Sequence, residues 1–429
     1  MPDTLYSAAM NNTLGIIIAI SLFTLWNLDL ISTLLNLKAL QPKLPAVFKG
    51  IFTQDKYAES QHYTRVNSKF DVIQSTFSLG VTLIFWFTGG FGYLDKCVRS
   101  FGDNEIINGL IFMGILFVGQ TLIGMPFQLY STFVIEDKFG FNKTTPKTFI
   151  IDQIKGLILM LLIGAPILSL ILWIFNSVDN AWIWAWASFT VLQLLLTYLA
   201  PTYILPLFNK FEPMGDGELK SAINELAKKC DFPLTEIYIM DGSKRSTKSN
   251  AFFTGFGKNK KIALFDTLIE NHTTEGLVGI LAHEIGHFKC KHIIQRMVTG
   301  ILQTAVLFFL IGIATDKDGG FSRLLFDAFY VEKISVYAGL IFFFMLFTPI
   351  SKILSIFSNM SSRKHEFEAD AYAANAQESP EHLIGSLKQL SADNLVNLTP
   401  HPFPVFMEYS HPPMLTRIEA LRKIKFEAK

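Results

Sequence analysis

Seven long apolar runs constrain the fold of this 429-residue chain more than any other feature of its sequence. Each run has at least the ~20 residues that an α-helix needs to cross the hydrocarbon core of a bilayer. The runs cover residues 14–37, 70–94, 106–135, 149–175, 182–208, 293–314 and 334–357. Half of all residues are hydrophobic and only 17% are charged. We therefore expect a mostly α-helical, polytopic membrane protein with about seven transmembrane helices that also carries a polar portion.

The runs divide the chain into four parts. Five spans and their loops fill residues 1–208, and the polar residues 209–292 have the mixed composition of a soluble domain. Two further spans fill 293–358, and a C-terminal helical part is expected over 359–429. The lipid bilayer is thus one partner of the chain. The net charge of +1 gives no global attraction to nucleic acid.

A β-hairpin is expected inside the polar part. Residues 249–255 and 261–265 are rich in strand-forming side chains, and Lys258-Asn259 lies between them as a turn. An extended substrate could add to the edge of such a hairpin. A plain hairpin that covers a neighbouring helix explains the same residues equally well.

Basic residues alternate between successive loops. No Lys or Arg precedes the first span, whereas the connection between the first two spans is rich in them, and the fourth connection, near Asp179, has none. The polar part and the C-terminal tail are again basic. Because cytoplasmic loops carry the excess of Lys and Arg, the N-terminus is expected outside and the polar part in the cytoplasm.

A His-Glu-x-x-His motif lies in the polar part and consists of His283, Glu284 and His287. On a helix the two histidines project from one face, so that two imidazole nitrogens can reach one tetrahedral zinc ion. Glu284 lies one position round, where it can act as a base that takes a proton from water. Residues 276–286 are otherwise uncharged, and a charge buried in such a run needs a partner such as a metal. The alternative is a chance match in a helix.

A catalytic zinc ion takes three protein ligands and keeps one position open. A third histidine six residues after the second, as in metzincins, is absent because position 293 is Ile, and His292 misses it by one and would point off the helix face. Glu366 and Asp370 offer carboxylates on one face of another helix. One could bind the metal while the other orients a ligand histidine. In isolation, a solvated charged helix explains that segment as well.

The His-Glu-x-x-His motif, followed by two spans and then Glu-Phe-Glu-Ala-Asp at 366–370, resembles the Ste24 family, the type I CAAX prenyl proteases of the M48 metallopeptidases. The resemblance covers nearly the whole chain. Residues 135–142 look like the family's characteristic loop, 249–251 like its substrate-side strand, and 409–417 like its C-terminal substrate motif. The resemblance implies seven membrane helices around a chamber, closed at the cytoplasmic end by a zincin-like α+β catalytic domain.

The resemblance also implies roles for individual residues. The three ligands of one zinc ion would be His283, His287 and Glu366. Glu284 would be the catalytic base, and Asp370 would lie behind the ligands and orient them. Three residues would contact the bound peptide: Asn250, His411 and Arg417. The implied substrates are peptides or proteins that are cleaved near a prenylated or otherwise membrane-associated C-terminus.

One departure from the family bears on the substrate. The segment between the seventh span and Glu366 is short compared with the eukaryotic pattern, which suggests a bacterial member in an inner membrane rather than one in the endoplasmic reticulum. Bacteria are not expected to make prenylated CAAX proteins, so a general quality-control protease for membrane proteins is an alternative. A third hypothesis, a transporter or scaffold with a structural metal, would need four protein ligands and no glutamate base.

Overall fold

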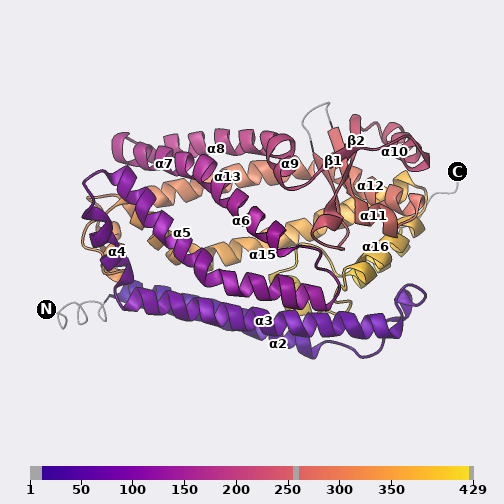
Figure 1. The fold of residues 1–429 in the computed structure, drawn as a ribbon, viewed down its shortest axis with the longest axis horizontal. Coiled ribbons are helices and arrows are strands. Elements are labelled where there is room, and N and C mark those ends of the chain that lie inside the picture. The colour runs from indigo at the N-terminus through magenta and orange to yellow at the C-terminus, as the bar shows by residue number, and fades with distance from the viewer. Residues whose placement is uncertain (1–11, 255–259, 425–429) are drawn as a thin grey trace.

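Seven helices in the described residues are long and apolar enough to cross a membrane, as the apolar runs predict. The computed structural model describes residues 12–254 and 260–424, and in it the long helices run between the two ends of the molecule (Figure 1). Their main segments are α2 (Thr13–Lys38), α3 (Gln54–Phe87), α5 (Glu105–Tyr130), α6 (Pro146–Leu159), α7 (Ala165–Ser177), α8 (Ala181–Leu199), α13 (His292–Thr315) and α15 (Val336–Ala376). α6 and α7 form one span through a short π-helical segment, and α8 continues through another into α9 (Leu205–Phe208).

The spans are packed loosely against one another. In the most apolar stretch of each helix at most 17% of the residues are buried, and in α8–α9 none is. α2 lies beside α3 along one edge, and α7, α8 and α13 lie together along the opposite edge (Figure 1). A solid bundle would bury a continuous stripe on every helix. The low burial therefore indicates an open ring, in agreement with the expected chamber.

The second apolar run does not form one helix to its end. α3 stops at Phe87, and Gly89 adopts a positive φ of 77° that turns the chain into the short α4 (Gly90–Arg99). This end of the molecule also holds α14 (Gly320–Ala328). A buried hydrogen bond of 2.6 Å from the Tyr337 hydroxyl to Asp95 ties α15 to α4 here. The apolar run extends past the span because α4 contributes to the same apolar core.

A four-stranded sheet organises the polar part at the other end of the molecule (Figure 1). Its strands are β1 (Phe211–Pro213), β2 (Leu234–Met240), β3 (Ala251–Thr254) and β4 (Lys260–Phe265), in the order β1-β2-β4-β3. β2 and β4 are parallel, whereas β3 pairs with β4 in the antiparallel sense. The expected hairpin is thus confirmed in its strands, and its turn at Lys258-Asn259 lies outside the described residues.

Short helices complete the polar part around this sheet. They are α10 (Glu218–Lys229), α11 (Asp266–Asn271), α12 (Thr274–Lys289), α16 (Glu381–Asp393), α17 (Pro402–Met407) and α18 (Met414–Arg422). One apolar core joins α10, α12, α16 and α18 to strands β2 and β4. Two distant stretches of the chain, 209–292 and 377–424, therefore pack together around one apolar core and form one body outside the spans.

α15 links that body to the membrane. It continues without interruption for 41 residues, from the seventh apolar run through Glu366 and Asp370 to Ala376. The division expected between 358 and 359 therefore falls inside a single helix. Its apolar N-terminal part packs among the spans, and its C-terminal part packs against α12 and α18.

Candidate active site

The contact between α12 and α15 brings the two sequence motifs together. α12 begins at an N-cap formed by Thr273, whose side chain accepts a hydrogen bond from the Gly276 N–H. A Cβ atom at Gly286 would lie 3.0 Å from the Cα and O atoms of Ala369 on α15. Such a contact is tighter than ordinary packing, so the absence of a side chain at Gly286 favours this close approach of the two backbones. The approach places the His-Glu-x-x-His face of α12 directly opposite Glu366.

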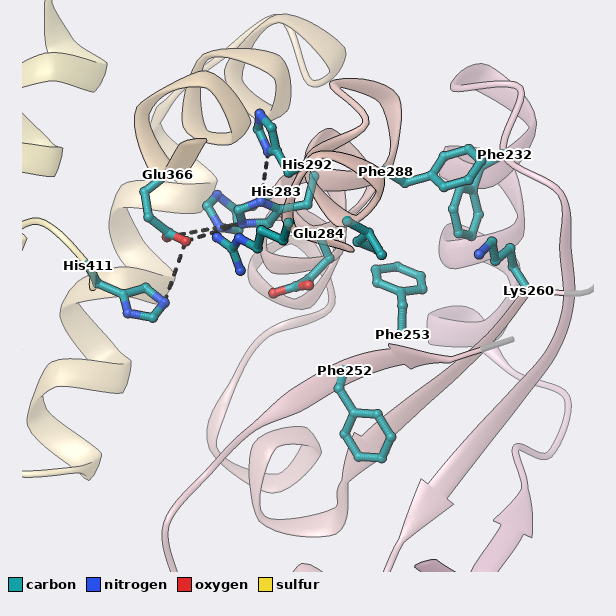
Figure 2. A pocket seen from close by; sticks show the side chains of 13 residues that line it. Phe232, Phe252, Phe253, Lys260, His283, Glu284, Phe288, His292, Glu366 and His411 are labelled. Carbon is teal, nitrogen blue, oxygen red and sulfur yellow. Dashed lines mark hydrogen bonds and ion pairs between the residues drawn. The ribbon is translucent and has the colours of Figure 1, made fainter. Parts of the chain in front are cut away.

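Three donor groups converge at this contact. The Nε2 atoms of His283 and His287 lie 3.1 Å apart. The two oxygens of Glu366 lie 3.4 Å from His283 Nε2 and 3.3 Å from His287 Nε2. Figure 2 shows Glu366 reaching across to the histidines from the neighbouring helix. The structure thus brings together the three residues that the sequence nominates as ligands.

The separations fit a tetrahedral metal ion. An ion with bonds of about 2.0–2.1 Å holds its ligand atoms about 3.3–3.4 Å apart, close to the three distances at this site. The surroundings also favour a positive charge. Burial lowers the pKa of His283, but its hydrogen bonds with Asp370 and Glu366 outweigh that effect, so the pKa of His283 is raised in the metal-free protein. Two imidazoles and one carboxylate form a donor set typical of catalytic zinc sites.

The Glu284 side chain faces a cavity and does not join the donor groups of His283, His287 and Glu366. Its side chain lines two adjoining cavities of ≈ 280 and ≈ 310 Å³, and both also reach His283 and Glu366. In Figure 2 its carboxylate points away from the helix toward the region beside β3. Burial raises the pKa of this carboxyl group. A half-buried carboxylate beside a cavity is the arrangement expected of a catalytic base.

Asp370 and Arg417 lie behind His283. The Asp370 Oδ1 atom is 2.8 Å from His283 Nδ1. Arg417 of α18 donates two hydrogen bonds of 2.8 and 2.6 Å to Asp370, and the residue is only 4% exposed. Its Nη1 atom lies 3.5 Å from Glu366. The polar contacts of the Arg417 side chain among the described residues are therefore with Asp370, Glu366 and His283.

His411 and Asn250 lie at the openings of the cavities. The His411 side chain is 62% exposed, and its Nε2 atom lies 3.5 Å from Glu366 (Figure 2). Asn250 is exposed just before β3 and lines the ≈ 310 Å³ cavity together with Glu284. Both side chains are placed where a molecule in the cavities would meet them.

The apolar walls of the two cavities were not anticipated from the sequence. One wall consists of aromatic side chains, namely Phe232, Phe252, Phe253 and Phe288. The other is aliphatic, with Leu383, Leu387 and Leu390 on α16. The spacing of the leucines predicts an amphipathic helix, but it does not indicate which body that helix faces. His292 also lies at the site, beside His287, although the sequence analysis placed it off the ligand face.

Comparisons with known protein families cover both parts of the chain. Residues 33–210 match the family described as CAAX prenyl protease N-terminal, five membrane helices. Residues 213–425 match peptidase family M48. The two matches meet where the chain passes from the fifth span into β1.

Individual relatives align over most of their length. The CAAX prenyl protease 1 homolog of Oryza sativa is 36% identical over 394 residues, covering 89% of this chain and 90% of the relative. The CAAX prenyl protease 1 of Saccharomyces cerevisiae is 34% identical over 410 residues, covering 90% and 89%. The crystal structure of S. mikatae Ste24p superposes with a TM-score of 0.87 at 34% identity, covering 95% and 99% of the two chains. The chain therefore belongs to the Ste24 family of M48 peptidases and is an integral membrane metalloendopeptidase of the CAAX prenyl protease type.

Proposed function

We propose that this protein hydrolyses peptide bonds with a zinc ion held by His283, His287 and Glu366 and with Glu284 as the general base. The observation that carries the proposal is the convergence of three donor groups within 3.1–3.4 Å beside a cavity that Glu284 also lines. When bound, zinc supplies Lewis-acid polarisation of the scissile carbonyl and makes water a better nucleophile at neutral pH. Glu284 accepts the proton of the attacking water and can return it to the leaving amine.

The peptide would lie along β3. This strand is an edge of the sheet, and among the described residues no other strand pairs with its free side. Backbone hydrogen bonds to a strand edge bind a peptide in an extended form, and pockets for alternate side chains give selectivity. Asn250, just before β3, would hold the peptide backbone, and the support is that it lines the same cavity as Glu284.

His411, Asp370 and Arg417 would support the reaction in different ways. His411 is exposed at the mouth of the cavities and can donate a hydrogen bond to the charge that develops on the scissile carbonyl. Asp370 accepts the Nδ1–H of His283 and thereby fixes the tautomer that leaves Nε2 free for the metal. The contacts of Arg417 favour positioning of Asp370, and a direct contact with the peptide stays a prediction.

We propose a substrate that is anchored in the membrane by a lipid near its C-terminus. The named relatives are CAAX prenyl proteases, and the two cavities beside Glu284 have apolar walls. Purified protein should cleave a prenylated peptide faster than the same peptide without the lipid, and a chelator should abolish both activities. Equal cleavage of both peptides would favour general quality-control proteolysis. No cleavage of either by the zinc-loaded protein would contradict the proposed function.

We propose that the catalytic part faces the cytoplasm. The support is the alternation of basic and non-basic loops along the seven spans. This orientation suits a bacterial inner membrane, which is suggested by the short segment before Glu366. It suits the endoplasmic reticulum equally, and the relatives named above are eukaryotic.

A further inference from the structure

The imidazole of His292 lies directly behind His287. The chain leaves α12 at Lys289 and turns at Lys291, which has a positive φ of 59°, and α13 begins at His292 next to the end of α12. His292 is 1% exposed, and its Nδ1 atom is 3.0 Å from His287 Nδ1 (Figure 2). Its other ring nitrogen, Nε2, is 2.8 Å from the Glu368 carboxylate.

Only one placement of protons satisfies these contacts when His287 binds a metal. A metal on Nε2 of a neutral His287 leaves the ring proton on Nδ1. That N–H points at His292 Nδ1, which must therefore be the acceptor. A neutral His292 then carries its proton on Nε2 and donates it to Glu368. The Nδ1 atom of His287 and both ring nitrogens of His292 then each have a partner of the required kind.

We propose that His292 and Glu368 are positioning residues that hold His287 in its metal-binding tautomer and orientation. They would do for His287 what Asp370 does directly for His283 at 2.8 Å. Each ligand histidine of α12 is then held by a carboxylate from α15, one directly and one through a second imidazole. α15 thereby supplies three carboxylates with different roles. Glu366 binds the metal, Glu368 supports His287 through His292, and Asp370 supports His283.

The same residues could instead hold a second metal ion. Donor atoms of His292, His365 and Glu368 lie within 4.8 Å of one another, and His365 Nδ1 is buried with no hydrogen-bond partner among the described residues. However, the rings of His292 and His365 are stacked at 4.0 Å with an interplanar angle of 13°. In-plane lone pairs of parallel rings do not converge on one ion. A metal on His292 Nε2 would also displace the proton that the contact with Glu368 requires.

The inference rests on the proposed role of His287 as a metal ligand. It is tested by replacing His292 with Asn, Gln or Phe, because Asn and Gln each keep a polar atom near only one of the two ring nitrogens. Asn places an oxygen near the position of Nδ1 and keeps the acceptor for His287, whereas Gln keeps a polar group only toward Glu368. Phe fills the space and removes both. Zinc affinity of the full-length protein in detergent is measured by competition with a chromophoric chelator, and the absorption spectrum of the cobalt-loaded protein reports ligand geometry.

We expect His292→Phe and His292→Gln to bind zinc about 10–100-fold more weakly than wild type, with an altered cobalt spectrum. His292→Asn should recover part of the lost affinity. His365→Phe is the matched control, because it keeps an aromatic ring against His292. It lies outside the hydrogen-bond relay from His287 through His292 to Glu368, so it should bind zinc as wild type does. Thermal unfolding of the metal-free variants checks that they fold.

Wild-type zinc affinity and an unchanged cobalt spectrum in His292→Phe would overturn the relay. If that variant does not fold, equal affinity of the Asn, Gln and wild-type proteins would overturn it as well. A second equivalent of tightly bound zinc that is lost in His365→Phe would replace the relay with a second metal site. Full metal content in His287→Ala would instead contradict the proposed function, so the two failures are distinguishable.

Discussion

The guanidinium of Arg417 lies behind His283, with its Nη2 and Nε atoms 2.6 and 2.8 Å from the two oxygens of Asp370. The same carboxylate contacts His283 Nδ1 at 2.8 Å. Paired, fork-shaped contacts of this kind fix the carboxylate in two directions at once. The orientation of one ligand histidine thus depends on a residue of α18, near the C-terminal end of the described chain.

Arg417→Lys should therefore weaken metal binding. Lysine keeps the positive charge but cannot make the two parallel hydrogen bonds to Asp370. Zinc retention against a dilute chelator should fall by about 10–100-fold, whereas KM of the zinc-saturated enzyme should change little. A raised KM at wild-type zinc affinity would support the peptide contact that the sequence predicts for Arg417.

Glu284→Gln should keep its zinc and lose nearly all peptidase activity. The amide fills the same space but cannot accept a proton, and loss of a general base typically costs about 10²–10⁴ in rate. Elemental analysis and peptide cleavage measure the two properties separately. Glu275→Gln, exposed in the first turn of the same helix, is the matched control. Substantial cleavage by zinc-loaded Glu284→Gln would exclude Glu284 as the base.

Glu366→Ala and Asp370→Ala should differ in kind. The first removes a donor group from the metal, so the protein should purify largely without zinc. The second removes the acceptor of the His283 Nδ1–H, so zinc should be retained at high concentration and lost in dilute chelator. Metal content at two zinc concentrations distinguishes them. Stoichiometric, chelator-resistant zinc in Glu366→Ala would move the third ligand elsewhere, with Glu368 and His292 as the next candidates.

His411→Ala should lower turnover without releasing zinc. Its exposed imidazole can stabilise the charge that develops on the substrate, and loss of one such donor typically costs about 10²–10³ in rate. The control is His382→Ala, since His382 lines neither cavity beside Glu284. A wild-type rate for His411→Ala, with zinc in place, would assign His411 to the surface alone.

Cysteine accessibility tests the orientation. In a background without Cys97, Cys230 and Cys290, Gly215→Cys before α10 should resist an impermeant thiol reagent in intact cells. A side chain there meets no atom within 4 Å, so only the membrane would protect it. Asp103→Cys, in the exposed loop after α4 at the opposite end, should react readily (Figure 1). The reverse pattern would invert the topology.

The spans and the histidine pair could be predicted because both depend on local spacing, whereas the choice of Glu366 over Asp370 as a ligand depends on the family resemblance. Apolar length alone identifies a membrane helix, and four-residue spacing places His283 and His287 on one face of α12. The end of α3 could not be located from the sequence, because residues 90–94 at the start of α4 continue the apolar run of the preceding span. Only the positive φ of Gly89 separates the two helices.

His292 shows where local spacing fails. Helical periodicity predicts that it points away from His287, but that prediction assumes that α12 continues past residue 290. α12 ends at Lys289, and the chain turns at Lys291, a residue type that does not favour a positive φ. Asp152, in the fourth apolar run, is a second case. Local spacing indicates no partner for its carboxylate, whereas the structure pairs it at 2.8 Å with Arg245, 93 residues away.

The unbroken α15 fixes the distance between the active site and the end of the seventh membrane span. A helix of 41 residues is roughly 60 Å long, and Glu366 lies nine residues, about 14 Å, beyond residue 357 at the end of the apolar run. One inserted residue would raise the ligand by about 1.5 Å and also rotate it by about 100° away from α12. The height of Glu366 above the bilayer therefore cannot change without also changing its angular alignment with α12. The distance from a lipid anchor to a cleavable bond could change only in near-whole helical turns.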